Sequence, residues 1–184
     1  EAIKLDPENG DIFHHRGQIN ALTEKLPEAK EDFERCMEIK PSFVPAKVQL
    51  AFCIYKTAMV QQSALLLQGA KRMFNDIIAS HPNYADAYSL FAQLNQEMQD
   101  FEAAVKNFDS AIAIDPNNPV HYVYKALLVC QWKRDIEKAM NLLKQAVTLD
   151  QKCDFAYETL ATLQVQSGNF EEAIKNFDKA IELV

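Results

Sequence analysis

Small and large apolar residues alternate along one face of the stretch FEAAVKNFDSAIAIDP, residues 101–116. Ala104, Phe108 and Ala111 are separated by four and three residues, which is the spacing of side chains on one face of an α-helix. Pro116 lacks the amide hydrogen that a helix interior needs, so the helix should end one or two residues before it. The pattern therefore predicts an amphipathic helix whose buried face alternates alanine with larger side chains.

The same pattern occurs at several other places in the chain. Copies begin at Ala29, Ala70 and Ala173, and a weaker copy begins at Ala139. An interval of 34 residues separates three pairs of equivalent positions: Pro7 and Pro41, Pro82 and Pro116, Ala146 and Ala180. This period is typical of a repeated pair of antiparallel helices.

A second signature lies in the helix that precedes each copy. An aromatic residue occupies its fourth repeat position in four repeats: Phe13, Tyr88, Tyr122 and Tyr157. A small residue, which lets two helices approach closely, follows four residues later in five repeats: Gly17, Ala51, Ala92, Ala126 and Ala161. On these positions and the period, the chain is identified as a member of the tetratricopeptide repeat (TPR) family. The resemblance implies an all-α fold, a right-handed alpha-alpha superhelix (TPR solenoid) of antiparallel helix pairs.

The repeats divide the whole chain, residues 1–184, into a single TPR array. We expect the end of a truncated repeat at 1–9 and five repeats at 10–43, 44–84, 85–118, 119–153 and 154–184, the last cut short. In the first repeat the helices are expected near 11–23 and 27–39, and Arg16 and Asn20 replace the family's apolar choices, which predicts a wetter first helix. Both ends fall inside repeats, so we expect a piece of a longer protein whose uncovered end faces could self-associate.

The second repeat is seven residues longer than the period. Seven residues correspond to about two helical turns, so added helix would keep its apolar face nearly in register. We therefore expect the insert, within residues 56–68, to lengthen one or both helices, with the corner at 61–63.

Composition and net charge argue against several classes of function. The chain is 48% hydrophobic and 24% charged with only four glycines, which suits a folded helical protein and argues against a phosphate-cradling loop. A net charge of −7 disfavours nucleic acid and favours a basic peptide. No run approaches the roughly 18 to 20 apolar residues of a membrane helix, and no membrane contact by this segment is expected.

Reactive side chains are present but do not form a recognisable catalytic or cofactor site, so an enzyme is not expected. His14 and His15 are adjacent, and neighbouring residues on a helix point about 100° apart rather than toward one metal ion. His81 and His121 precede predicted helices and are expected to be solvated or capping residues. The cysteines lack CxxC spacing and are expected to be buried free thiols of a reducing compartment: Cys36, Cys53, Cys130 and Cys153.

The family resemblance implies that the first helix of each repeat lines a concave groove. The candidate groove residues combine acidic, amide and apolar side chains: Asp11, His14, Gln18, Phe52, Tyr55, Asp86, Ser89, Gln93, Gln96, Leu127, Phe155 and Glu158. Such a lining suits an amphipathic helix that carries Lys or Arg on one side. Phe52, Leu127 and Phe155 could equally pack between repeats. Asp86 and Glu158 are the stronger candidates, because a carboxylate gains nothing from core packing.

Four strings also resemble a narrower group. AIKLDPEN, HHRGQ, LLVCQWKRD and CDFAYET are not required by the generic repeat, and they resemble the large TPR import receptor of the mitochondrial outer-membrane translocase (TOM complex). The resemblance implies a receptor on the cytosolic face of the mitochondrial outer membrane, with its N-terminal anchor outside this sequence. This segment would be its C-terminal, preprotein-binding part, with other translocase subunits as further partners.

Two other functions of TPR proteins, binding of chaperone tails and an enzyme's asparagine ladder, require particular residues on the first helices of the repeats. The resemblance implies a clamp for chaperone tails elsewhere in the receptor. The corresponding positions here hold His14, Gln18, Gln49, Asp86 and Leu90 in place of the clamp's lysine, arginine and asparagine. Asp86 stands where a base is needed, so no chaperone tail should bind this segment. The asparagine ladder of O-GlcNAc transferase is absent: His15, Gln49, Leu90, Tyr124 and Thr159 stand there. A generic TPR scaffold or co-chaperone adaptor remains the alternative.

Overall fold

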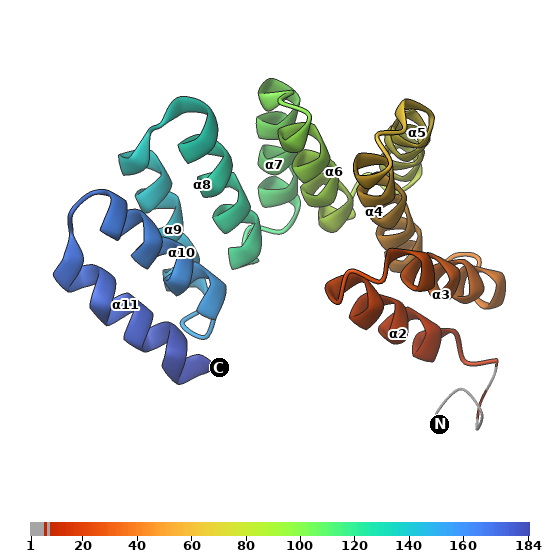
Figure 1. The fold of residues 1–184 in the computed structure, drawn as a ribbon, viewed down its shortest axis with the longest axis horizontal. Helices are drawn as coiled ribbons and strands as arrows, with labels where there is room; N and C mark the ends of the chain where they lie inside the picture. The colour runs from red at the N-terminus through yellow and green to blue at the C-terminus, as the bar shows by residue number, and fades with distance from the viewer. Residues whose placement is uncertain (1–5, 7) are drawn as a thin grey trace. The chain divides into compact units, whose positions relative to one another are not determined.

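Every regular element in the described part of the chain is an α-helix. The computed structural model describes residue 6 and residues 8–184. The helices are α2 (Gly10–Leu22), α3 (Leu26–Ile39), α4 (Val44–Val60), α5 (Ala64–Ser80), α6 (Ala85–Glu97), α7 (Phe101–Ile114), α8 (Pro119–Lys133), α9 (Ile136–Leu149), α10 (Asp154–Gln166) and α11 (Phe170–Leu183) (Figure 1). The predicted all-α fold is confirmed. Of the truncated repeat end predicted at residues 1–9, residues 1–5 and 7 lie outside the described residues.

The helices pack in consecutive pairs within two compact units. The first unit extends to Asn83 and holds the pairs α2–α3 and α4–α5. The second unit, Tyr84–Val184, holds the pairs α6–α7, α8–α9 and α10–α11. Within each unit the second helix of one pair contacts the first helix of the next pair. The single array over the whole chain remains a prediction.

The alternating face of the second helices forms the core. Ala104, Phe108 and Ala111 on α7 are fully buried, and α7 ends at Ile114 as predicted. The equivalent residues of α3 and α9 are also fully buried: Ala29, Phe33 and Cys36, and Ala139, Leu143 and Ala146. On α11 the equivalent Phe177 is only half-buried. The apolar pattern that marks the repeat is therefore packing rather than a binding site.

The long second repeat has two long helices, as predicted. α4 and α5 are each 17 residues long, compared with 13 and 14 for α2 and α3. The corner between them is Gln61–Ser63, where Gln62 adopts a positive φ of 51°. The inserted residues therefore extend helices and do not form a long loop.

The cysteines are free thiols, as predicted, although Cys130 is only half-buried. Cys36, Cys53 and Cys153 are buried in the apolar cores. Burial raises the pKa of the Cys53 thiol to about 11, which keeps it protonated at neutral pH.

Two helical glycines differ in what surrounds them. A Cβ atom added at Gly17 would lie 2.8 Å from Cε1 of the buried Phe33 ring, whereas one added at Gly69 would meet nothing within 4 Å. We expect Gly17→Ala to destabilise the protein by about 1 to 3 kcal/mol through overpacking. We expect Gly69→Ala to stabilise it by about 1 kcal/mol, because alanine is the better helix former. Urea unfolding of both variants measures this; equal shifts in the same direction would contradict the close packing at Gly17.

Candidate peptide-binding surface

The candidate residues of the first unit lie on α2 and α4, which contact each other. Asp11 is exposed, and the Lys40 ammonium donates a hydrogen bond to its carboxylate over 2.6 Å. That hydrogen bond lowers the pKa of Asp11. Gln18 is half-buried, with its Oε1 3.2 Å from Nδ1 of His15. The charge of Asp11 is therefore already paired within the unit.

Two other candidates in this unit are buried. His14 is 7% exposed and lies edge-on to Phe43, with ring centroids 5.0 Å apart. Burial lowers the pKa of His14, so the ring is neutral at physiological pH. Tyr55 is completely buried beside the half-buried Phe52, with centroids 5.7 Å apart. Neither His14 nor Tyr55 offers a surface to a bound peptide, so both differ from the expectation for groove residues.

In the second unit α8 contacts both α6 and α10, so the first helices of three repeats lie in a row. Asp86 on α6 and Glu158 on α10 are exposed. No lysine or arginine forms an ion pair with either carboxylate among the described residues. These two carboxylates are the acidic groups of the predicted set that have no cationic partner in the described part of the chain, although the Tyr84 side chain is hydrogen-bonded to Asp86.

Amide and apolar candidates lie on the same three helices. Gln93 and Gln96 are half-buried, and Nε2 of Gln96 donates a hydrogen bond to Oε1 of Gln131 over 2.6 Å, which links α6 to α8. Leu127 and Phe155 are half-buried and pack against the core shared by α8, α9 and α10. They therefore do pack between repeats, while each keeps part of its side chain accessible. Ser89 is 4% exposed and acts as a packing residue.

An aromatic contact that the candidate set omitted joins this surface to the core. The Tyr124 ring on α8 is nearly parallel to Phe108, with centroids 6.4 Å apart, and lies 5.5 Å from the Phe155 centroid. Burial raises the pKa of Tyr124, so its hydroxyl stays protonated. Tyr124 is one of the five residues compared above with the asparagine ladder, and its large aromatic side chain with a polar hydroxyl is the sequence signal that could have added it to the candidate residues.

The prediction that His121 is a solvated or capping residue is wrong. His121 is the third residue of α8 and only 2% exposed. Burial lowers its pKa, and the carboxylates of Asp86 and Asp115 partly oppose this effect. Neither ring nitrogen has a hydrogen-bond partner among the described residues. The prediction overlooked the repeat position of His121, which is buried in other repeats. The equivalent residues of three other repeats are the buried alanines Ala46, Ala87 and Ala156.

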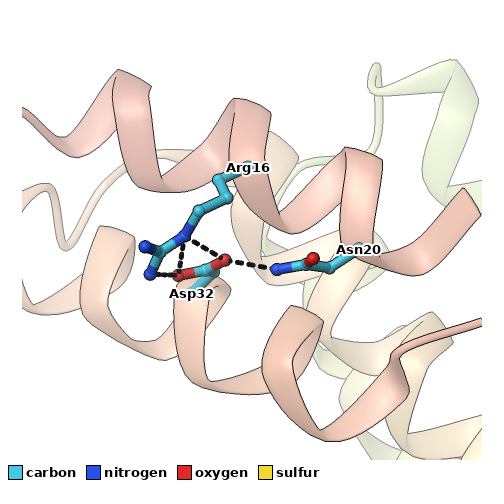
Figure 2. Close-up of polar contacts among 3 residues, drawn as sticks. All are labelled: Arg16, Asn20 and Asp32. Atoms are coloured by element: carbon cyan, nitrogen blue, oxygen red, sulfur yellow. Dashed lines mark hydrogen bonds and ion pairs between the residues drawn. The ribbon is translucent and has the colours of Figure 1, made fainter. Parts of the chain in front are cut away.

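The polar residues of α2 hold a buried carboxylate instead of merely facing water. Figure 2 shows Arg16 and Asn20 on α2 directed at Asp32 on α3, which is 2% exposed. Nε of Arg16 donates to both carboxylate oxygens, at 3.0 and 2.9 Å, and Nδ2 of Asn20 donates to Oδ2 at 2.9 Å. Because every oxygen of the buried carboxylate is hydrogen-bonded, this network holds α2 on α3.

Two kinds of site are absent from the described residues. They contain no group of three or more His, Cys, Asp or Glu residues arranged to hold a metal ion. In this part of the chain, none of the helices combines the length and apolar character that crossing a bilayer requires.

The fold and the row of first helices define a tetratricopeptide repeat protein, and the tetratricopeptide repeat model matches residues 10–43, 85–118 and 156–183. The chain therefore belongs to this family. It is 41% identical to the mouse mitochondrial import receptor subunit TOM70 over 182 residues, and 40% identical to the human one. These alignments cover 99% of this chain and 30% of each relative. The predicted resemblance to the import receptor is confirmed.

Solved structures give the same result for the fold. The crystal structure of yeast Tom70 matches with a TM-score of 0.76 and 26% identity, over 100% of this chain and 38% of that one. TTC0263, a thermophilic TPR protein of Thermus thermophilus, matches with a TM-score of 0.78 over 96% of this chain and 92% of its own. The latter is 20% identical and shows the fold alone. The predicted TPR solenoid class is confirmed.

Proposed function

We propose that this chain is a non-enzymatic, preprotein-binding segment of a mitochondrial import receptor at the cytosolic face of the outer membrane. The similarity to TOM70 of mouse and human supports the receptor assignment, although the chain spans about 30% of those relatives. Mitochondrial preproteins are the proposed ligands, and other translocase subunits are proposed partners. No cofactor or nucleic acid takes part.

The proposed contact surface is the exposed side of α6, α8 and α10. It consists of the groove candidates that remain accessible in the second unit: Asp86, Gln93, Gln96, Leu127, Phe155 and Glu158. The observation that supports it most is the pair of carboxylates without ion-pair partners beside half-buried amide and apolar side chains on neighbouring helices. A basic amphipathic helix would place lysine or arginine near the carboxylates and its apolar side against Leu127 and Phe155.

This surface predicts selective binding of basic amphipathic peptides. Each hot-spot contact would contribute roughly 1 to 2 kcal/mol to the binding free energy, so we expect modest affinity. Fluorescence titration of a labelled preprotein segment with the chain measures this affinity. The matched control is a peptide of the same composition whose order destroys the amphipathic pattern, and it should bind at least about tenfold more weakly.

The alternative function, a co-chaperone adaptor, predicts the opposite selectivity. An adaptor would bind an acidic chaperone-tail peptide, whereas the exposed Asp86 and Glu158 would repel its carboxylates. Tight binding of the acidic tail in the same titration, together with no binding of the amphipathic peptide, would replace the receptor proposal by the adaptor.

A further inference from the structure

The corner between α4 and α5 extends beyond the neighbouring corner of the first unit. Ala51 is equivalent to Gly17, and α4 continues nine residues past Ala51 whereas α2 continues five residues past Gly17. On the other side, α5 begins six residues before Ala70, whereas α3 begins three before the equivalent Ala29. All seven extra residues therefore lie at the corner. At 1.5 Å per residue they move it outward by roughly 5 Å.

The extended corner is an uncharged polar turn, Gln61–Ser63, flanked by exposed apolar side chains. Val60 and Leu65 are 78% and 80% exposed, and Met59 is 40% exposed. The fourteen residues between Lys56 and Lys71 carry no charge. Exposed apolar groups gathered at a projecting point are costly in water, so such a feature calls for an apolar environment around it.

Several backbone amides at this corner are already hydrogen-bonded. The amide groups of the corner residues, Gln61, Gln62 and Ser63, donate to carbonyl oxygens of α4 at 2.9, 3.3 and 2.9 Å. The amide group of Leu66 in the first turn of α5 donates to the Ser63 hydroxyl at 3.3 Å. These four donors are satisfied internally, so they add no cost when the corner leaves bulk water. The amides of Ala64 and Leu65 begin α5 and have no intrahelical acceptor, so they need the water and headgroup oxygens of the lipid surface.

Charge around the corner has the opposite sign to the rest of the chain. Residues 41–75 contain four basic residues and no acidic residue, whereas the remaining chain contains 15 basic and 26 acidic residues. Lys71 and Arg72 form no ion pair with any described residue. Arg72 follows Leu65 by two helical turns on the same exposed face of α5, roughly 10 Å behind the tip. The next acidic residue, Asp76, lies one turn further away.

We propose that the α4–α5 corner inserts into the surface of an anionic lipid bilayer. Amphipathic elements enter the boundary between headgroups and acyl chains by about 5 to 10 Å, which matches the separation of Leu65 from Arg72 along α5. Val60 and Leu65 then contact acyl chains while Lys71 and Arg72 reach the lipid phosphates. A protein partner with acidic side chains would need basic groups at the tip itself, and the tip is uncharged.

This contact differs from a membrane-spanning segment. The sequence-based expectation of no membrane contact rested on the lack of a long apolar run, and a corner that lies in the lipid surface needs no such run. The corner belongs to the first unit and is independent of the peptide surface on α6, α8 and α10.

Vesicle flotation of the whole 184-residue chain tests the proposal. We expect the chain to float with vesicles that contain phosphatidylserine in phosphatidylcholine, and not with pure phosphatidylcholine. Val60→Ser plus Leu65→Ser should lower the partition coefficient about tenfold. Lys71→Gln plus Arg72→Gln should lower it about fivefold for each base, and binding of the unaltered chain should weaken as salt rises.

The matched control removes two other exposed apolar residues, on α11. Ile174 and Ile181 on α11 are 61% and 74% exposed, and Ile174→Ser plus Ile181→Ser should leave flotation unchanged. Circular dichroism should show the same helix content in all variants, since the altered residues are exposed apart from the half-buried Lys71. The proposal is overturned if the unaltered chain does not float with anionic vesicles, or if the α11 variant loses binding while the corner variant keeps it. Peptide titration of the corner variant should be unaffected, which separates this result from the function of the groove.

Discussion

Asp86→Lys combined with Glu158→Lys is expected to weaken binding of a basic amphipathic peptide about 30-fold. Each reversal removes one attraction and adds one repulsion at an exposed site, together about 1 kcal/mol per residue. About 2 kcal/mol in total corresponds to that change in Kd. Fluorescence anisotropy titration with a labelled preprotein segment gives the two affinities. Since both carboxylates are exposed, the difference should shrink as salt rises.

The control for this variant changes the net charge by the same amount on other helices. Glu102 on α7 and Asp178 on α11 are exposed acidic residues outside the row of first helices. Glu102→Lys plus Asp178→Lys should alter the affinity by less than about threefold, because the charges are screened beyond roughly 10 Å. An equal loss in both double variants would mean that overall charge, rather than the surface of α6, α8 and α10, attracts the peptide.

Phe108→Ala should cost about 3 to 5 kcal/mol of unfolding free energy, the largest loss we expect from a single substitution. The Phe108 side chain is completely buried between α7 and α8 and stacks on Tyr124. Removal of the Phe108 ring leaves a cavity and removes the surface on which the Tyr124 ring packs. Tyr124 in turn contacts Phe155. Denaturant unfolding of the variant measures the loss.

Phe177→Ala is the matched variant, because Phe177 has the same repeat position on α11. Phe177 is only half-buried, so its loss should cost less than half as much. Phe108→Ala should also weaken peptide binding through the displaced tyrosine, whereas Phe177→Ala should not. Equal destabilisation by the two substitutions would contradict the role of the α7–α8 contact in the core of the second unit.

The helical-pair architecture was predictable because the 34-residue interval between equivalent positions can be read directly from the sequence. The spacing of the alanine and aromatic positions fixed which residues are buried on α7, and Pro116 marked the end of that helix. The insert was predictable for the same reason, since seven residues add helical turns without rotating the apolar face. Helix geometry alone was sufficient for both conclusions.

The depth of burial was not predictable from the same spacing. A repeat position gives the direction of a side chain, whereas its exposure depends on the size of side chains from the neighbouring helices. Tyr55, Ser89 and His14 occupy repeat positions expected to face the groove, and all three are nevertheless buried. His121 replaces a buried alanine, and no local signal distinguishes it from an exposed histidine.

Hydrogen-bond and ion-pair partners that lie on different helices also could not be predicted from the sequence. Arg16 and Asn20 were recognisable as unusual polar residues on α2, but their common partner Asp32 is on another helix. Asp11 and Asp86 look equivalent in the sequence, and only the structure shows that Asp11 is paired with Lys40. This pairing is the reason why the proposed acidic contacts lie in the second unit.

The location of a bound peptide tests the central claim most directly. A basic amphipathic preprotein segment that carries a photoreactive residue on its apolar side can be crosslinked to the chain and the product mapped by mass spectrometry. We predict crosslinks on α8 and α10 around Leu127 and Phe155, which compete with excess unlabelled peptide. Crosslinks confined to the second helices of the repeats, α7, α9 and α11, or to the first unit would contradict the proposed surface.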